Sequence, residues 1–278
     1  MNDLFDSAPA TTGQTRIHVG IGGWTYAPWR GGMFYPEKLV QRRELEYASR
    51  HVTAIEINGT YYGAQKPDTY ARWRDETPPG FVFTAKAPKR IMASRRLAGT
   101  GAQVEDFVGG IATLGDRLGA ILWQFDRGQS PSVDALADFV ALLPRKADGR
   151  RLRHALELRD AALFTPELLA LLRGQNIALV CAGSDEHPSF GDLTADFAYA
   201  RVMQARAGLA EGYTPAELDA WAERARSWST GGDPDDLAHV GPRLADGQPR
   251  EVFLFFIAAA KERNPAAAQA LLRRLSAG

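Results

Sequence analysis

Four strand-like segments of this chain end in polar or charged side chains that share one face of the strand. Residues two apart in a β-strand point the same way, so Glu56 must face the same side as Asn58, and Glu157 the same side as Arg159. The isoleucines and leucines next to them must face the other side. If the segments are parallel neighbours, their polar ends converge, which is typical of a site rather than a core. The segments are 54–58, 81–86, 120–124 and 155–159.

Strand-like and helix-like patterns alternate along the rest of the chain. Eight strand-like runs, each followed by a helix, indicate a parallel sheet, and eight such units close naturally into a TIM-type (β/α)8 barrel. An open doubly wound sheet is the structural alternative. We expect the strands at 17–23, 52–58, 81–86, 119–125, 154–159, 177–182, 197–202 and 251–257.

Proline and threonine mark the starts of several expected helices. Pro67 suits a first helical turn, Thr165 before Pro166 is a plausible N-terminal cap, and Thr214-Pro215 begins another helix. The expected helices span 37–50, 67–76, 104–116, 130–143, 165–174, 214–228 and 266–275. We therefore expect a flexible tail over residues 1–15 and a single barrel domain over residues 16–278. A Gly/Asp/Pro-rich insertion at 229–249 has no role that the sequence indicates.

Composition excludes several classes of function. The chain has 278 residues, 45% of them hydrophobic, and its formal net charge is zero, so no global field attracts nucleic acid or an anionic membrane. No run approaches the roughly 20 apolar residues that a membrane-spanning helix needs. Cys181 is the only cysteine, which excludes an intramolecular disulfide and is compatible with a cytoplasmic location.

Glu56, Glu157 and Lys86 are the candidate catalytic residues. Two carboxyl groups held ~5–9 Å apart in a cleft can divide the roles of acid and base or nucleophile. Alternatively, Glu157 pairs with Arg159 or Lys86 in a structural network. Lys86 could form a Schiff base if burial lowered its pKa, but binding of an anion is the favoured interpretation. The reaction class stays open among hydrolase, isomerase and lyase.

The candidate substrate-binding residues surround these three groups. Arg159 and Arg201 can make forked contacts to a carboxylate or phosphate, and the amides of Asn58 and Gln124 can orient a ligand. Trp24 and Tyr61 can form walls of the site. The aromatic residues at 24–35 and 61–62 are explained equally well by a stacking floor for a ligand or by packing of a lid over the barrel.

Cofactor chemistry has little support in the sequence. We expect no organic cofactor, because the chain has no dinucleotide fingerprint, phosphate-binding loop or HExxH motif. We expect no dedicated metal site either, since only His187 among the histidines follows a strand end. A divalent metal bound by carboxylates at Glu56, Glu157 or Asp185 stays open. Cys181, at the end of an apolar strand, is expected to be a buried small hydrophobe.

Several motifs together resemble the domain of unknown function 72 family, also called YecE-like. They are Gly22-Gly23-Trp24-Thr25-Tyr26, Phe34-Tyr35-Pro36, Glu56-Ile57-Asn58, Lys86-Ala87-Pro88, Leu122-Trp123-Gln124-Phe125 and Glu157-Leu158-Arg159. The resemblance covers nearly the whole chain after the tail and implies a TIM barrel, but it implies no established reaction. The chain is also similar, more distantly, to barrels of the endonuclease IV and xylose isomerase kind.

Three strand ends depart from the pattern of that family. The chain has Ile21-Gly22 where the family usually has Thr-Ser, and Met203-Gln204 where it usually has His-Gly. Phe256-Ile257 replaces the usual polar asparagines at the eighth strand. These changes put any role carried over to strands one, seven and eight in doubt, whereas strands two to five keep the pattern of the family.

We therefore expect an enzyme that acts on a small anionic or polyhydroxylated substrate, such as a sugar phosphate or nucleotide, at the carboxyl-terminal mouth of the barrel. At least one of the cations Lys86 and Arg159 should have a nitrogen free of carboxylate contact that points into a cavity. A nucleic-acid-binding or DNA-repair-associated barrel that uses Lys89, Arg90, Arg95 and Arg96 is the alternative. A non-catalytic scaffold that binds a partner is a further possibility. The sequence does not indicate an oligomeric state.

Overall fold

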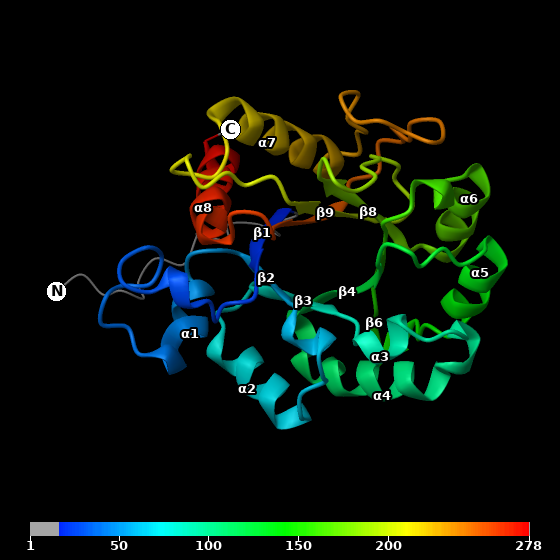
Figure 1. The fold of residues 1–278 in the computed structure, drawn as a ribbon, viewed down its shortest axis with the longest axis horizontal. Helices are drawn as coiled ribbons and strands as arrows, with labels where there is room; N and C mark the ends of the chain where they lie inside the picture. Colours follow the sequence, from blue (N-terminus) through cyan, green and yellow to red (C-terminus); the bar gives the residue numbers. More distant parts are fainter. Residues whose placement is uncertain (1–16, 278) are drawn as a thin grey trace.

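Eight parallel strands form a closed barrel with the helices on its outside (Figure 1). The computed structural model describes residues 17–277. Around the barrel the strands follow the order β1-β10-β9-β8-β7-β4-β3-β2. The predicted (β/α)8 barrel is therefore confirmed, and the open sheet is wrong. The expected tail at residues 1–15 lies outside the described residues.

The barrel strands lie within one or two residues of their predicted positions. They are β1 (Ile17–Gly22), β2 (Ala54–Ile57), β3 (Val82–Lys86), β4 (Leu118–Phe125), β7 (His154–Leu158), β8 (Ala178–Gly183), β9 (Phe197–Val202) and β10 (Glu251–Phe256). A short hairpin, β5 (Lys146–Ala147) and β6 (Arg150–Arg151), lies outside the barrel and was not predicted. Glu56 on β2 lies opposite Thr84 on β3, and Gln124 on β4 lies opposite Glu157 on β7. This register brings the polar strand ends to one level.

Alternate residues of each strand face two different hydrophobic regions. Ile55 and Leu156 point outward and pack in the large core between the barrel and the helices. Ala54, Leu122 and Phe255 belong to a smaller cluster formed by the opposite strand faces in the barrel interior. The interior is thus apolar along its middle, and polar side chains on the inward faces lie near the strand ends.

The N-terminal end of the barrel interior has its own polar group. The carboxylate of Glu251 accepts hydrogen bonds from His18 Nε2 at 2.8 Å and from Arg153 Nη2 at 2.5 Å. The charges of this group pair with one another, and the group lies at the end of the barrel opposite the predicted site. TIM barrels place their chemistry at the other end, where the strands finish.

The helices differ more from prediction than the strands do. They are α1 (Glu44–Ala48), α2 (Pro67–Glu76), α3 (Lys89–Met92), α4 (Gly101–Ile111), α5 (Val133–Ala141), α6 (Pro166–Gln175), α7 (Pro215–Ser229) and α8 (Asn264–Ser276). The helix expected at 37–50 is wrong over its first half, because Val40 is extended and 50% exposed and offers no buried apolar face. None of the helices in residues 17–277 is long and apolar enough to cross a membrane.

No helix follows β8 within the described residues, so the expectation of a helix after every strand is wrong at this position. Residues 184–196 form an irregular segment, and the insertion after α7 packs against it. Gly191 N donates to Ala238 O at 2.8 Å, and the carboxylate of Asp192 accepts from the backbone of Val240 and Gly241. In Figure 1 this orange insertion lies between α7 and α6. It therefore covers the part of the barrel wall that lacks a helix.

The close contact between β1 and β2 predicts the effect of a single methyl group. A Cβ atom at Gly20 would lie 2.1 Å from Ala54 O, so we expect Gly20→Ala to lower the free energy of unfolding by about 3 kcal/mol. Gly109→Ala in α4 is the matched control, because its Cβ would meet no atom within 4 Å, and it should stabilise by about 0.5–1 kcal/mol. Urea denaturation of both variants measures the difference. Equal stabilities would contradict this account of the barrel wall.

Candidate active site

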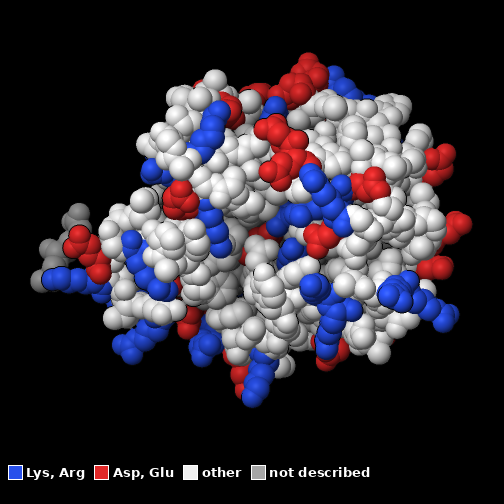
Figure 2. Space-filling view, in the orientation of Figure 1, with Lys and Arg blue, Asp and Glu red and all other residues white. Residues whose placement is uncertain are grey.

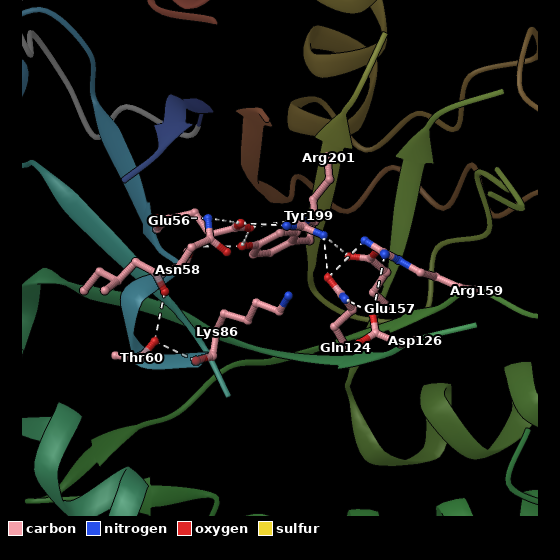
Figure 3. A network of polar contacts seen from close by, with 12 residues as sticks. Glu56, Asn58, Thr60, Lys86, Gln124, Asp126, Glu157, Arg159, Tyr199 and Arg201 are labelled. Atoms are coloured by element: carbon pink, nitrogen blue, oxygen red, sulfur yellow. Dashed lines mark hydrogen bonds and ion pairs between the residues drawn. The ribbon is translucent and has the colours of Figure 1, made fainter. Parts of the chain in front are cut away.

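Arg201 occupies the centre of the polar layer at the carboxyl ends of the strands (Figure 3). Its Nη2 donates to Glu56 Oε1 at 2.9 Å and its Nε to Glu56 Oε2 at 3.1 Å, a forked contact. Its Nη1 donates to Glu157 Oε2 and to Gln124 Oε1. All three of these partners and Arg201 itself are buried. One guanidinium thus links the ends of β2, β4, β7 and β9.

Glu56 has a complete set of donors besides Arg201. Asn58 Nδ2 donates to Glu56 Oε1 at 3.0 Å, and the hydroxyl of Tyr199 donates to Oε2 at 2.8 Å. Thr84 Oγ1 lies 2.8 Å from the Tyr199 oxygen and must donate to it, because the tyrosine proton is already used. Each carboxylate oxygen of Glu56 therefore accepts two hydrogen bonds, which uses its acceptor positions.

A second chain of contacts runs from Glu157 to the surface. Arg159 Nε donates to Glu157 Oε1 at 2.9 Å, and its two other nitrogens reach Gln124 Oε1 and Asp126 Oδ1. Tyr61 donates through its hydroxyl to Asp126 Oδ2 at 3.0 Å. The side chain of Arg159 is 20% exposed, so this cation, unlike Arg201, reaches solvent at the rim.

Lys86 lies beside this network without joining it. In Figure 3 no dashed line reaches its side-chain nitrogen, and within residues 17–277 no hydrogen bond or ion pair of Lys86 Nζ is found. The nitrogen lies instead 4.1 Å from the centre of the Tyr61 ring, a cation–π contact. Lys86 Nζ meets the expectation that at least one of the two cations has a nitrogen free of carboxylate contact, and Arg159 Nη2, which within the described residues contacts only the amide oxygen of Gln124, is a second such nitrogen.

Burial and neighbouring charges together set the protonation states of Lys86, Glu157 and Tyr199. Burial and the neighbouring Arg201 cation lower the pKa of Lys86 to about 8, although Glu56, Glu157 and Asp126 oppose this. For Glu157, burial would raise the pKa, but Arg201 and Arg159 outweigh it and hold the pKa below its ordinary value. Burial, with the charge of Glu56, raises the pKa of Tyr199 well above its ordinary value. At neutral pH, Glu157 is therefore ionised and Tyr199 neutral.

A cavity of about 420 Å³ lies above these residues, within the usual size range of small-molecule sites. Tyr62, at its rim, is 89% exposed. The cavity wall includes Asn58, Tyr61, Lys86, Gln124, Arg159, Arg201 and Lys261. Glu56 and Glu157 are not in the wall and are fully buried beneath it.

The loop after β10 holds Lys261 at this cavity, and the backbone of this loop is strained. Ala258 and Ala259 have φ of 55° and 45°, left-handed values that cost about 1–2 kcal/mol for a residue with a Cβ atom. Trp29 Nε1 donates to Lys261 O at 2.9 Å, and Lys261 Nζ lies 4.7 Å from the centre of the Tyr26 ring. Strain of this kind is found preferentially at functional sites.

The structure brings together every predicted site residue except Trp24. Trp24 packs at 4.8 Å against Trp73 and also contacts Phe83, so it belongs to the outer core, and its predicted role as a wall of the site is wrong. Arg201 was expected to bind a ligand by its fork, but that fork is occupied by Glu56. Most of the aromatic segment 24–35 is packed rather than open to a ligand: Trp29, Phe34 and Tyr35 are buried against one another.

Three residues of the site were missed by sequence reasoning. Tyr199 is two residues before Arg201 and Asp126 two after Gln124, so the period of the strand places each on the inward face. That signal was present and could have found both. Lys261 had none, because a loop fixes its direction.

Two alternative chemistries find no support in the described residues. Residues 17–277 contain no cluster of three His, Cys, Asp or Glu side chains that suits a metal ion. The carboxylates of Glu56 and Glu157 are instead occupied by arginine, while Asp185 accepts from Gln204. Cys181 is buried, which raises its pKa to about 12 and makes it a poor nucleophile. Whether the protein uses a cofactor stays a prediction.

Comparison with known proteins identifies relatives of this barrel. A family model described as "Protein of unknown function DUF72" matches residues 18–278. UPF0759 protein YecE of Escherichia coli K12 is 29% identical over 141 residues, which are 50% of this chain and 48% of YecE. UPF0759 protein YunF of Bacillus subtilis 168 is 28% identical over 80 residues, 29% of this chain and 27% of YunF. The chain thus aligns with about half or less of the length of these curated relatives.

Solved structures support the fold. A DUF72 family protein of Thermotoga maritima has a TM-score of 0.71 at 21% identity, with 94% of this chain and 99% of that chain covered. One of Enterococcus faecalis has a TM-score of 0.70 at 17% identity, with 94% and 95% covered. A xylose isomerase-like TIM barrel/4-hydroxyphenylpyruvate dioxygenase fusion protein has a TM-score of 0.50 at 18% identity, with 93% and 42% covered. At these identities the likeness concerns the fold.

The central position of Arg201 predicts a large effect of its removal. Arg201→Met leaves two buried carboxylates with one partner cation fewer each, and we expect the free energy of unfolding to fall by about 3–5 kcal/mol at pH 7. Arg159→Met is the matched control, because Glu157 keeps Arg201, and it should cost about 1–2 kcal/mol. Urea denaturation of both variants measures the two losses. Equal losses would show that Arg201 does not hold the layer together.

The same pair predicts a dependence on pH. In the wild type, the low pKa of Glu157 stabilises the fold above the unfolded glutamate pKa of about 4.3, and this contribution is lost as the pH falls through the lower folded value. In Arg201→Met the carboxyl group of Glu157 stays buried but loses the largest charge that lowers its pKa, so its pKa rises. We expect the deficit of the variant to shrink between pH 7 and pH 5, and a constant deficit would contradict the ion-pair account.

Proposed function

The chain belongs to DUF72, a protein family of unknown function, and we propose that it is an enzyme for a small anionic or polyhydroxylated substrate. The substrate would lie in the cavity at the carboxyl ends of the strands. The chemistry we propose is proton transfer or hydrolysis without an organic cofactor. Sugar phosphates and nucleotide-like compounds belong to this substrate class.

The observation that carries the proposal is the state of Lys86. The carboxylates beneath the cavity are engaged by Arg201, Arg159, Asn58 and Tyr199, which leaves Lys86 Nζ without an ionic partner. A lysine whose pKa lies near 8 can give and take a proton near neutral pH, and such a group typically contributes about 10²–10⁴-fold to a rate. A perturbed pKa inside a cavity is itself typical of functional sites.

Roles for the other residues follow from the charged groups that each still has free for a ligand. Arg159 reaches the rim and Lys261 the wall, so we assign both to the anionic part of the substrate. Glu56 and Glu157 were predicted as acid and base. Because their oxygens already accept from arginine, we now propose that they position Arg201 and set the charge around Lys86.

Binding of anions should depend on Lys86. We expect Lys86→Met to weaken binding of sugar phosphates and carboxylates at least about tenfold, a loss of about 1.4 kcal/mol. Lys89→Met removes an exposed lysine from the following helix and should change affinity less than about twofold. Wild-type affinity should also fall as the pH rises through about 8, since Lys86 then loses its charge.

Thermal-shift screening followed by calorimetry makes this measurement. A panel in which no anion binds the wild type, or in which Lys86→Met and Lys89→Met behave alike, would contradict the proposal. Unchanged affinity in Lys86→Met would favour a scaffold that binds a partner without catalysis.

Binding of nucleic acid is a second candidate because of a neighbouring cavity. Arg95 and Arg96 line a cavity of about 590 Å³ beside the loop after β4. Gln129 connects this cavity to the site, because its amide oxygen accepts from Asp126 N and its amide nitrogen donates to Met92 O. Figure 2 shows basic and acidic side chains interspersed on the visible face, which makes an extended contact with phosphates less favourable.

The two candidates separate in a salt titration. A nucleic-acid-binding barrel should bind a single-stranded oligonucleotide at low salt, and Arg95→Ala with Arg96→Ala should weaken it. Each lost phosphate contact lowers the slope of log K against log salt by about 0.7 for single strands. Because we favour the small-molecule site, we expect no oligonucleotide binding at physiological salt. Tight binding there that Lys86→Met leaves unchanged would reverse this preference.

A further inference from the structure

We infer that Lys86 is a nucleophile that forms an imine with an aldehyde or ketone substrate bearing an anionic group. The inference rests on the proposed function, because it places the substrate in the same cavity. It adds the substrate class and a covalent step, and it assigns to Lys86 a role other than attraction of charge.

The geometry around Lys86 favours a free amine over a fixed ammonium. A lysine in an ion pair is held protonated, but no carboxylate lies within 4 Å of Lys86 Nζ in residues 17–277. Tyr61 presents its ring face to the nitrogen, which leaves the other sides of the nitrogen open to the cavity. The amine therefore lies at a cavity wall with no ionic partner to displace within the described residues.

The groups that face Lys86 come from several elements and act in both directions. Arg201 on β9 and the burial of the side chain favour the neutral amine, whereas Glu56 on β2, Glu157 on β7 and Asp126 after β4 favour the ammonium. Tyr61 lies against the nitrogen, and Lys261 lines the same cavity. Burial is the largest of these influences, and burial and Arg201 together outweigh the carboxylates, so the pKa of Lys86 is about 8.

That outcome gives Lys86 a large kinetic advantage over ordinary lysines. With a pKa of about 8, about a tenth of Lys86 is the neutral amine at pH 7. For a lysine with the ordinary pKa of 10.5, the neutral fraction at pH 7 is roughly 300-fold smaller. Since only the neutral amine attacks a carbonyl carbon, Lys86 should react well before surface lysines do.

The covalent step balances without an added oxidant or reductant. The nitrogen lone pair of the neutral amine attacks the carbonyl carbon, a C–N bond forms and the C=O π bond breaks. The oxygen then leaves as water, with one proton from the amine and one from solvent, and the nitrogen keeps its other proton as an iminium. The cation so formed withdraws electrons from the neighbouring carbon, which is how lysine imines promote proton abstraction or carbon–carbon cleavage.

Charges around the cavity indicate which carbonyl compounds would fit. Arg159 follows β7 and Lys261 follows β10, two strands that are not neighbours in the barrel, and both cations line the cavity. Within residues 17–277 each terminal nitrogen of Arg159 makes one hydrogen bond to the protein, which leaves a hydrogen for a ligand. A phosphate or carboxylate bound by these groups would bring an attached carbonyl carbon into the cavity beside Lys86 Nζ.

Trapping with borohydride tests the inference on the whole chain. The protein is incubated with glyoxylate, pyruvate, glycolaldehyde phosphate or dihydroxyacetone phosphate, reduced, and examined by intact-mass spectrometry and peptide mapping. We expect one of these probes to add a single reduced adduct at Lys86, at least about tenfold more than at any other lysine. Trapping should increase as the pH rises from 6 to 8.

Two variants keep the result interpretable. Lys86→Arg retains a positive charge but has no nucleophilic amine, so it should bind the anionic probes and lose the adduct. Lys89→Met removes an exposed lysine that does not line the cavity and should leave the Lys86 adduct within about threefold of the wild type. An adduct that persists in Lys86→Arg, or that is spread over surface lysines, would overturn the inference.

Analogues that have no carbonyl group separate this inference from the proposed function. Lactate and glycerol phosphate can bind the cavity but cannot form an imine. If they or the carbonyl probes bind with dependence on Lys86 and no adduct is trapped, the imine is wrong and the proposed function stands. If none of the compounds binds and none is trapped, both are wrong.

Discussion

The contact of one guanidinium with two buried glutamates is the interaction on which the mouth of this barrel depends. Arg201, on β9, donates hydrogen bonds to the ends of three other strands at once, because Glu56, Glu157 and Gln124 come from β2, β7 and β4. Charges without solvent are costly, and either carboxylate alone would destabilise the barrel interior. Arg201 and the two carboxylates together form a layer, and the remaining acceptor positions of the carboxylates are filled by amide, phenol and Arg159 donors. The layer closes the apolar interior and forms the floor of the cavity.

The same contact determines the chemistry available to Lys86. If the glutamates were not engaged by arginine, one of them would pair with this lysine and fix it as an ammonium. Arg201 occupies both carboxylates and adds a like charge nearby, so the amine stays unpaired in a cavity. Stability and reactivity are thus linked: burial lowers the pKa of Lys86, and the residue that makes the buried carboxylates tolerable adds to that effect, so the pKa is about 8. The strained backbone at Ala258 and Ala259 directs a second lysine to the same space.

The period of side chains along a strand predicted both the barrel and the floor of its site. It placed Glu56, Asn58, Glu157 and Arg159 on inward faces, because one face of each strand must meet the helices. It could not say which carboxylate pairs with which cation, since that depends on the register between strands far apart in sequence. Loops were predicted least well: they have no period, so the direction of Trp24 depended on packing that the sequence does not specify. The expected pattern of a helix after every strand fails after β8, where the insertion that takes the place of the helix begins about 45 residues further along the chain.

The pKa of Lys86 is the quantity that tests the central claim most directly. It can be measured by NMR titration of protein containing ¹³C-labelled lysine, with Lys86→Met to assign the resonance. The account predicts a midpoint near 8, well separated from those of the surface lysines. A midpoint at the ordinary lysine value of about 10.4 would show that a carboxylate still stabilises the ammonium, and would contradict the role we assign to Arg201.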